Sequence, residues 1–391
     1  VWTTMSFCNS LVMGASILIS QSVGAEKRED IGEYAGAMLK YNNIIPIFLC
    51  FFWMIFPKPV FMILGVSDNV MPLCLGYVRW YAPLFLLTGL GGSLGVILQT
   101  SNYTKPLVVY GCIRSGLNIF LDWMLIFGNL GMPALGIEGA AIATVIAEYV
   151  GAIYISVIFF TSKKLPTRPS WNDVKKGHFR SYLNAAKLGI NIALEDFAWN
   201  IGNMILIRIL NSINEYAAGI YTIIFGVEVL AVVIIGAIGS GTMTLTSEAI
   251  GRKNLAQYKG ITLCAYAVCA IVTVVMIVGA VLFPEQILSL FTSDKTVIAS
   301  CGVYLLLIGI NLFSKSGNII IGNAIRGSGN TKWMLFTQIF GTIWIVIVAS
   351  VLVFICKLGI LGVFLAVLLD EGVRALINFW KYLRIVKKWR E

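Results

Sequence analysis

The sequence predicts an all-α, polytopic membrane protein made of two pseudo-symmetric six-helix bundles, with about 11 of 12 transmembrane helices present. Composition is the first observation behind this prediction. Of the 391 residues, 58% are hydrophobic and 12% are charged, with a mean hydropathy of +0.85, whereas soluble domains carry about 25% charged residues. The second observation is that apolar runs recur along the chain, each long enough to cross about 30 Å of hydrocarbon. The third is an internal repeat.

The apolar runs define about eleven expected spans. They lie at residues 1–23, 41–56, 70–98, 106–127, 135–160, 182–210, 216–249, 261–283, 297–325, 333–356 and 358–380. Lys and Arg gather in every second loop and in the C-terminal tail, which the positive-inside rule assigns to the cytoplasm. This places Val1 outside and Glu391 in the cytoplasm of a plasma membrane, or of the inner membrane in a bacterium. The formal net charge of +10 therefore reports topology and predicts no nucleic-acid partner.

The internal repeat is visible in landmarks that recur at a fixed offset. Gly24 matches Gly251 and Thr104 matches Thr331, both at an offset of 227 (251 − 24 = 331 − 104). The stretch LGIEGAAIA recurs later as LGILGVFLA at an offset of 223 (358 − 135). Two such offsets indicate that one bundle of helices is present twice. Because six helices separate the copies, both have the same orientation in the membrane.

The repeat also predicts the organisation of the chain. We expect an N-terminal bundle at residues 1–160, a cytoplasmic basic linker at 161–181 and a C-terminal bundle at 182–391. Val1 aligns with Glu228, so the first helix of the second bundle has no counterpart in the first. The repeat therefore predicts one more helix ahead of Val1.

Four short motifs follow one another along the chain. They are QSVGA at 21–25, DWMLIFG at 122–128, GIEGAAIAT at 136–144 and IRGSGN at 325–330. Their order and spacing resemble the multidrug and toxic compound extrusion (MATE) family, over essentially the whole chain without the family's first helix. The resemblance implies a secondary active efflux antiporter for multiple drugs and organic cations, with alternating access between two lobes. It implies no cofactor, a proton or sodium ion as coupling ion, and the lipid bilayer and cationic amphiphilic small molecules as partners. We expect a monomer.

Charged residues inside spans mark candidate sites, because each costs about 2.5–3.5 kcal/mol on insertion scales. Asn191, Glu195 and Trp199 recur at i, i+4 and i+8 and form a polar and aromatic helix face. A cationic aromatic ligand would find both a counter-charge and a stacking ring there. The resemblance implies that Glu195 binds a cation or a proton. The alternative is a glutamate held by neighbouring polar groups.

Two further residues of the second half are candidates for substrate or proton binding. Glu228 is expected at a similar depth on the next helix, and Lys315 shares one face of a later helix with Asn318. Lys315 could pair with Glu195 or Glu228, either as a pair that a proton or a cationic drug breaks, or as a permanent structural pair. Many members of the family have an acid at the position of Lys315, so this departure weakens the expectation of a sodium site there.

In the first half, Asn118 and Asp122 lie one turn apart on one helix face. The resemblance implies that they form an ion-coupling pocket, with a sodium ion near Asp122 as a candidate. The alternative is a structural Asp122 paired to Arg79 or Arg114.

Glu148 and Glu371 are equivalent across the repeat. This symmetric placement favours a structural role for the carboxylate in both halves.

Other function classes receive less support. A flippase for lipid-linked sugars, from the same superfamily, typically has a strongly cationic cavity, whereas here acids and bases are about equal in the spans. An ion channel should show a polar filter repeated around an axis rather than a twofold repeat. An enzyme is not expected, because the chain has a single histidine and neither a P-loop nor a metal-binding motif.

Overall fold

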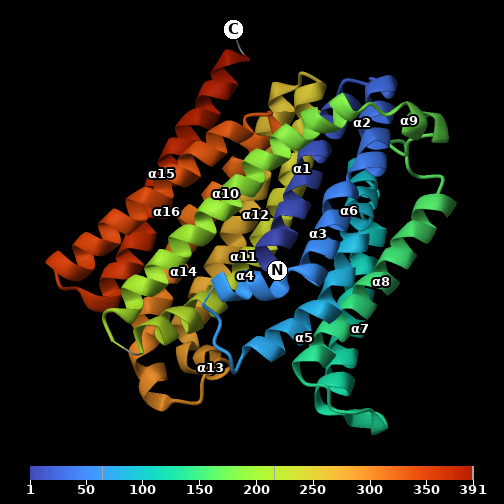
Figure 1. Cartoon of the computed structure of the whole chain (residues 1–391). Helices are drawn as coiled ribbons and strands as arrows, with labels where there is room; N and C mark the ends of the chain where they lie inside the picture. The colour runs from blue at the N-terminus through green and yellow to red at the C-terminus, as the bar shows by residue number, and fades with distance from the viewer. Residues whose placement is uncertain (64, 215, 390–391) are drawn as a thin grey trace. The chain divides into compact units, whose positions relative to one another are not determined.

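The structure, a computed structural model, describes residues 1–63, 65–214 and 216–389 (Figure 1). Every regular element in these ranges is helical. The α-helices are α1 (Trp2–Gly24), α2 (Arg28–Tyr41), α3 (Ile44–Ile55), α4 (Pro57–Ile63), α5 (Met71–Tyr81), α6 (Phe85–Thr100), α7 (Lys105–Phe127), α8 (Ile137–Thr161), α9 (Trp171–Lys176), α10 (Phe179–Asn211), α11 (Ala217–Gly251), α12 (Leu255–Leu282), α13 (Pro284–Ser289), α14 (Lys295–Gly327), α15 (Thr331–Ser350) and α16 (Gly359–Lys388). Short 3₁₀ turns at Ala82–Leu84 and Asn129–Gly131 and a π-helical turn at Val351–Ile355 complete them.

Eight segments of the described chain are long and apolar enough to cross a membrane. They are Trp2–Gly24, Arg28–Ile55, Met71–Thr100, Ile137–Thr161, Ala217–Gly251, Leu255–Leu282, Cys301–Gly327 and Thr331–Ile355. Helices α7, α10 and α16 are 23, 33 and 30 residues long and carry more charged residues. The expected span at 41–56 was wrong in its start, since that segment begins at Arg28. Glu29 and Asp30 in the first turn stabilise the start of the helix through its dipole. They also lower the local hydropathy, so this part of the helix is not apparent as a span in the sequence. The predicted cytoplasmic Glu391 lies outside the described residues.

The internal repeat is visible in the helix bounds. The segment Arg28–Ile55 and helix α12 have starts and ends that both differ by 227 residues (255 − 28 and 282 − 55). The short helices α4 and α13 begin at Pro57 and Pro284, and α6 and α14 end at Thr100 and Gly327, again 227 residues apart. The same supersecondary unit therefore occurs in both halves of the chain.

Contacts divide the chain into two compact units, Val1–Ala193 and Leu194–Glu391. The boundary falls inside α10, whereas the sequence placed the start of the second bundle at residue 182. The first turns of α10 join the first unit because they pack tightly against α1. A Cβ atom on Gly189 would lie 2.6 Å from Leu11 Cα, and one on Gly14 would lie 2.1 Å from the carbonyl oxygen of Ala185. Small residues allow this close backbone approach, as is common between membrane helices.

We expect Gly189→Leu to separate α1 from α10 and to destabilise the protein by at least about 1–3 kcal/mol, the usual cost of overpacking. Thermal unfolding of the purified protein in detergent measures the change. Gly116→Leu is the matched control, since a Cβ atom on Gly116 in α7 meets no heavy atom within 4 Å. Equal unfolding temperatures for the two variants would show that the α1–α10 contact does not require glycine.

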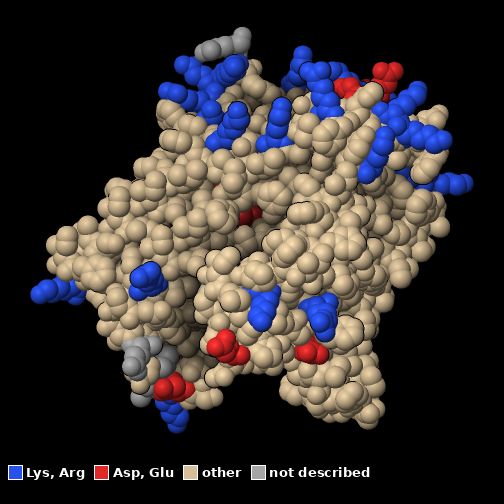
Figure 2. Space-filling view, in the orientation of Figure 1, with Lys and Arg blue, Asp and Glu red and all other residues tan. Residues whose placement is uncertain are grey.

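The basic linker packs on helix α2 within the first unit. Ser170 and Asp173 form a reciprocal capping box that starts α9. Lys40 Nζ on α2 donates a hydrogen bond to the carbonyl oxygen of Lys175 at 3.1 Å. Figure 2 shows Lys and Arg gathered over α2 and α9 in the first unit, and over the C-terminal turns of α16 in the second. Each unit therefore carries a strongly basic end.

In the second unit, α14 packs against α11, α12 and α16. The apolar core near the start of α11 includes Ile224, Leu305 and Phe364, each at most 2% exposed. Burial of these side chains fixes the rotation of α11, α14 and α16 about their axes. As a result, charged residues on the three helices face one another.

Candidate functional site

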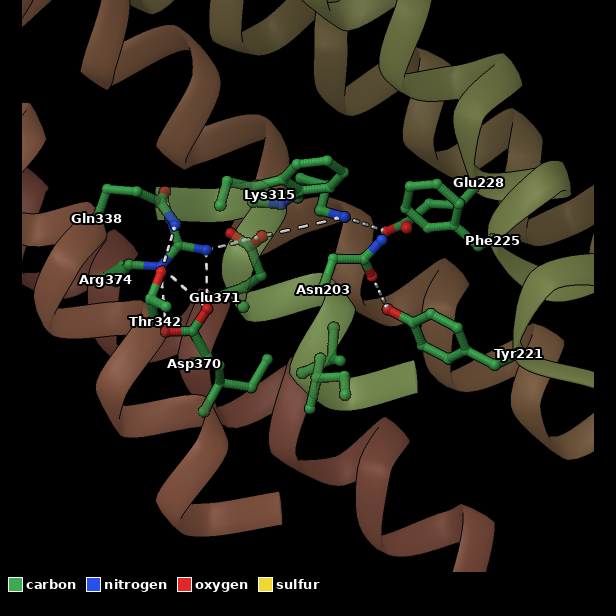
Figure 3. Close-up of a pocket in the computed structure, with 15 residues that line it drawn as sticks. Asn203, Tyr221, Phe225, Glu228, Lys315, Gln338, Thr342, Asp370, Glu371 and Arg374 are labelled. Atoms are coloured by element: carbon green, nitrogen blue, oxygen red, sulfur yellow. Dashed lines mark hydrogen bonds and ion pairs between the residues drawn. The ribbon is translucent and has the colours of Figure 1, made fainter. Parts of the chain in front are cut away.

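Five charged side chains meet inside the second unit. They are Glu228 from α11, Lys315 from α14, and Asp370, Glu371 and Arg374 from α16, here called the charge cluster (Figure 3). They line a cavity of about 40 Å³, which is room for one or two water molecules or a small ion. The cavity is completed by Trp199, Gly202, Asn203, Leu206, Tyr221, Phe225, Gln338, Thr342, Ile345 and Val367.

Lys315 pairs with Glu228 in this cluster. Its Nζ atom lies 2.7 Å from Glu228 Oε1 and 4.0 Å from Glu371 Oε1. The Lys315 side chain is 12% exposed and the Glu228 side chain is 1% exposed. Asn311 Nδ2 also donates to Glu228 Oε1, at 3.4 Å. Of the two pairings open from the sequence, the structure has Lys315–Glu228, and Glu195 lies elsewhere.

Arg374 organises the α16 side of the cluster. Its Nε atom donates to both oxygens of Asp370 at 3.1 and 3.0 Å, and Nη2 lies 2.8 Å from Asp370 Oδ2 and 3.0 Å from Glu371 Oε1. The remaining Nη1 donates to Gln338 Oε1 at 2.8 Å. Gly341 on α15 provides the space, since a Cβ atom there would lie 2.4 Å from Arg374 Cδ. The planar guanidinium thus holds two carboxylates in fixed positions.

Asn318 supports the cluster from behind. Its Nδ2 atom donates to the backbone oxygen of Glu371 at 2.9 Å and to Glu371 Oε2 at 2.7 Å. Asn378 Nδ2 donates in turn to Asn318 Oδ1 at 3.1 Å, and Asn378 Oδ1 accepts from Trp333 Nε1 at 3.3 Å. Asn318 does not line the cavity. Its hydrogen bonds orient Glu371, which does.

The charge cluster has one more acid than it has bases. Three carboxylates, Glu228, Asp370 and Glu371, face two cations, Lys315 and Arg374. In fully ionised form the cluster therefore carries a formal charge of −1. Burial makes an uncompensated charge expensive, so uptake of one positive charge is favourable. Chemically, the arrangement can accept one proton or bind one monovalent cation.

The predicted face on α10 is split by the structure. Glu195 is 7% exposed and forms hydrogen-bonded ion contacts with Arg326 from the end of α14. Trp199 lines the cavity, and its ring centre lies 6.1 Å from that of Phe225. Asn191 belongs to the first unit and does not line the cavity. Glu195 therefore has a cationic partner of its own, which the sequence did not indicate.

In the first unit, Asn118 and Asp122 do not form a shared contact. Asn118 Nδ2 donates to Thr144 Oγ1 at 3.4 Å, and Asp122 Oδ1 is buried without a hydrogen-bond partner among the described residues. The alternative pairing of Asp122 with Arg114 is wrong, since Arg114 binds Glu148 at 2.7 Å. Arg79 forms no ion pair within the described ranges.

Glu148 is further fixed by Tyr110, whose hydroxyl donates to it at 2.8 Å. Glu148 is thus held by an arginine of the neighbouring helix α7, whereas Glu371 is held by an arginine of its own helix α16. Across the described residues, no three Asp, Glu, His or Cys side chains converge as a metal-binding group.

Sequence reasoning missed Asp370, Arg374 and Gln338. A signal was present, because Asp370 and Arg374 are four residues apart within the last span, a spacing that pairs opposite charges on one helix face. Gln338 carried no such signal, since its contact with Arg374 joins residues that are 36 positions apart in the sequence.

Comparison with known proteins agrees with this architecture. The sequence profile of the MatE family matches residues 1–124 and 191–352. The probable multidrug resistance protein NorM of Thermotoga maritima is 26% identical over 407 residues, which cover 100% of this chain and 83% of that protein. The uncharacterized transporter YisQ of Bacillus subtilis is 24% identical over 383 residues, covering 97% of this chain and 82% of that protein.

Two solved structures show the fold. A crystal structure of MATE in the straight conformation has a TM-score of 0.89 at 19% identity and covers 99% of this chain and 86% of that one. An outward-facing multidrug resistance MATE family transporter of the MOP superfamily has a TM-score of 0.90 at 20% identity, covering 100% and 87%. These likenesses confirm the predicted all-α polytopic fold. Since the profile matches most of the chain, the protein belongs to the MatE family of multi-pass membrane transporters.

Proposed function

We propose that this protein is a secondary active antiporter that exports cationic amphiphilic compounds in exchange for protons or sodium ions. The observation that carries the proposal is the buried charge cluster with its single excess carboxylate. A proton, a sodium ion and an organic cation each neutralise that charge, so the cluster accommodates one of them at a time. Mutually exclusive binding of ion and cargo at one site is one way to couple their exchange.

Aromatic rings beside the cluster support an organic cation as cargo. The rings of Tyr221 and Phe225 are stacked with centres 6.1 Å apart (Figure 3). The ring of Trp199 lies next to that of Phe225. Aromatic faces attract cations and cover the apolar body of an amphiphile. The cavity of about 40 Å³ is smaller than the roughly 300–1,000 Å³ of typical ligand sites. Cargo therefore binds in another conformation of the alternating-access cycle, in which the aromatic wall moves away from α16.

The other predicted sites keep their roles within this proposal. Glu195, with Arg326 as its partner, binds the cargo or a proton when that pair opens. Asp122, whose buried Oδ1 atom lacks a hydrogen bond, binds the coupling ion in the first lobe together with Asn118. The basic ends in Figure 2 support a cytoplasmic location for the α2–α9 region and for the end of α16. We propose that the protein acts as a monomer in the plasma membrane.

The test is efflux of a fluorescent organic cation from proteoliposomes, with a proton gradient and a sodium gradient imposed separately. We expect Glu195→Gln to lower gradient-driven efflux at least tenfold. The neutral amide cannot take up a proton and cannot form an ion pair with Arg326 or with a cationic cargo. Glu285→Gln is the control, since Glu285 is an exposed residue of the short helix α13.

Two outcomes would contradict the proposal. Wild-type efflux that responds to neither gradient would rule out antiport, whereas unchanged efflux in Glu195→Gln would remove only Glu195 from the site. Ion flux that is independent of cargo and far exceeds any exchange would indicate a channel.

A further inference from the structure

The carboxylate of Glu371 in the second unit is held at both of its oxygens. Arg374 Nη2 lies 3.0 Å from Oε1, and Asn318 Nδ2 donates a hydrogen bond to Oε2 at 2.7 Å. The counterpart of Glu371 in the internal repeat is Glu148 of the first unit, at the offset of 223 (371 − 148). The surroundings of one repeated carboxylate can therefore be compared within a single chain.

Glu148 has the same two kinds of partner. Arg114 Nη1 on α7 lies 2.7 Å from Oε1, and the Tyr110 hydroxyl donates a hydrogen bond to Oε2 at 2.8 Å. One oxygen again meets a guanidinium and the other meets a neutral donor. Glu148 lies near the middle of the span Ile137–Thr161, where a carboxylate without a partner is costly.

The two arginines come from helices that are not equivalent in the repeat. At the offset of 227, Arg114 on α7 corresponds to Gly341 on α15 (341 − 114). At the offset of 223, Arg374 on α16 corresponds to Gly151 on α8 (374 − 151). The arginine and the glycine have therefore exchanged helices between the two units, while the arginine–glutamate pair is present in both.

Steric contacts explain why each glutamate has one of these arginines and not both. A Cβ atom on Gly341 would overlap with Arg374 Cδ. A Cβ atom on Gly151 would lie 2.6 Å from the Tyr110 ring, and its three nearest heavy atoms all belong to that ring. In the second unit the shorter Thr337 stands at the position of Tyr110 (337 − 110 = 227). A large side chain thus fills the space from one helix or from the other.

We propose that Arg114 and Tyr110 are positioning residues of the first lobe, which hold Glu148 as an ionised and charge-balanced carboxylate. All three residues line a cavity of about 270 Å³ in the first unit. With Glu148 balanced, Asp122, which follows Arg114 by two turns on α7, supplies the excess negative charge of this lobe. That last step rests on the proposed function, whereas the positioning of Glu148 does not.

The test is labelling of Glu148 in the purified full-length protein by dicyclohexylcarbodiimide, which adds to protonated carboxyl groups and leaves an N-acylurea that peptide mass spectrometry detects. We expect little labelling in the wild type. In Arg114→Gly, labelling should rise at least about tenfold, because a carboxylate that has lost its cation inside a span takes up a proton. Lys105→Gly is the matched control and should label as the wild type does, since Lys105 is an exposed cation at the start of the same helix.

A guanidinium supplied from α8 should restore the protection. The triple variant Arg114→Gly, Tyr110→Thr and Gly151→Arg reproduces the arrangement of the second unit, so labelling of Glu148 should return to the wild-type level. The double variant Arg114→Gly with Tyr110→Thr is its control and should stay labelled. Rescue from another helix separates the positioning of charge from packing, because the triple variant does not rebuild the contacts of an arginine on α7.

Three results would overturn the proposal: strong labelling of the wild type, unchanged labelling in Arg114→Gly, or a triple variant labelled as strongly as the double one. Tyr110→Phe keeps the ring and removes only the hydroxyl donor, and should raise labelling about threefold. Unchanged labelling there would also contradict the proposal, so this variant decides the matter where Arg114→Gly does not fold.

Cation efflux from proteoliposomes is measured on the same variants. We expect efflux to fall about tenfold in Arg114→Gly and to recover in the triple variant, because an unbalanced Glu148 competes with Asp122 for the coupling ion. A wild type that exports no cation would contradict the proposed function. The labelling of Glu148 would still decide the role of Arg114, so the two failures are distinguishable.

Discussion

Replacing Arg374 by Met is expected to unfold the second lobe or to lower its free energy of unfolding by about 3–5 kcal/mol, the usual cost of removing one partner from a buried ion pair. Arg374 is 8% exposed and bonds to Asp370, Glu371 and Gln338 at once. Without it, two carboxylates lie close together with only Lys315 nearby. Thermal unfolding and the monodispersity of the purified protein measure this loss.

Further variants at the same site separate the contribution of the Arg374 charge from that of its hydrogen bonds. Arg374→Lys keeps the charge but cannot bond to Asp370, Glu371 and Gln338 together, so we expect an intermediate loss. Arg374→Met combined with Asp370→Asn restores the charge balance and should recover part of the stability. Arg384→Met is the control, because Arg384 is an exposed residue of the same helix that lies over the Trp380 ring. An Arg374→Met protein as stable as this control would contradict the assigned role.

The second large effect is expected at the Lys315–Glu228 pair. Lys315→Met leaves Glu228, which is 1% exposed, without its cation, and the free energy of unfolding should fall by about 3–5 kcal/mol. In the double variant Lys315→Met with Glu228→Gln, both charges are absent, so most of the stability should return. Transport should not return, because Glu228, the carboxylate of the cluster on the same helix as Tyr221 and Phe225, is then absent, although Asp370, Glu371 and Arg374 keep the formal charge of −1.

This double-variant design separates a structural pair from a functional one. The coupling free energy of the two substitutions reports the pair's contribution to stability, and cation efflux from proteoliposomes reports its role in exchange. Lys332→Met with Glu285→Gln is the matched control, since both residues are exposed. Full efflux in the stable double variant would show that Lys315 and Glu228 form a permanent structural pair.

Much of the fold could be predicted from the sequence. The expected spans at 216–249, 297–325 and 333–356 begin and end within two residues of α11, of α14, and of α15 with its π-helical turn, because hydrophobic length is a local property. The start of the span expected at 41–56 was wrong because the residues before it, in α2, are helical although they are polar. The family resemblance then supplied the all-α, polytopic class and the family that the comparisons confirm.

The candidate site could be predicted only in part. Glu228, Lys315 and Trp199 do line one cavity, whereas Asn318 lies behind Glu371 and Asn191 belongs to the other unit. Gln338 was missed because its partner Arg374 is on another helix, 36 residues away in the sequence. The partner of Glu195 was missed because the long side chain of Arg326 reaches back from the end of α14.

The sequence by itself determined the class of the protein, its membrane spans, its duplication and the supply of buried charges, since all of these follow from hydropathy, charge and spacing along the chain. Only the tertiary structure decided which charges are partners. Lys315 had two carboxylates within its expected reach, and the packing of α11 against α14 selected Glu228 and left Glu195 to Arg326. The physical reason is that an ion pair depends on how each helix is rotated about its axis, and that rotation is set by the burial of apolar side chains from several helices together.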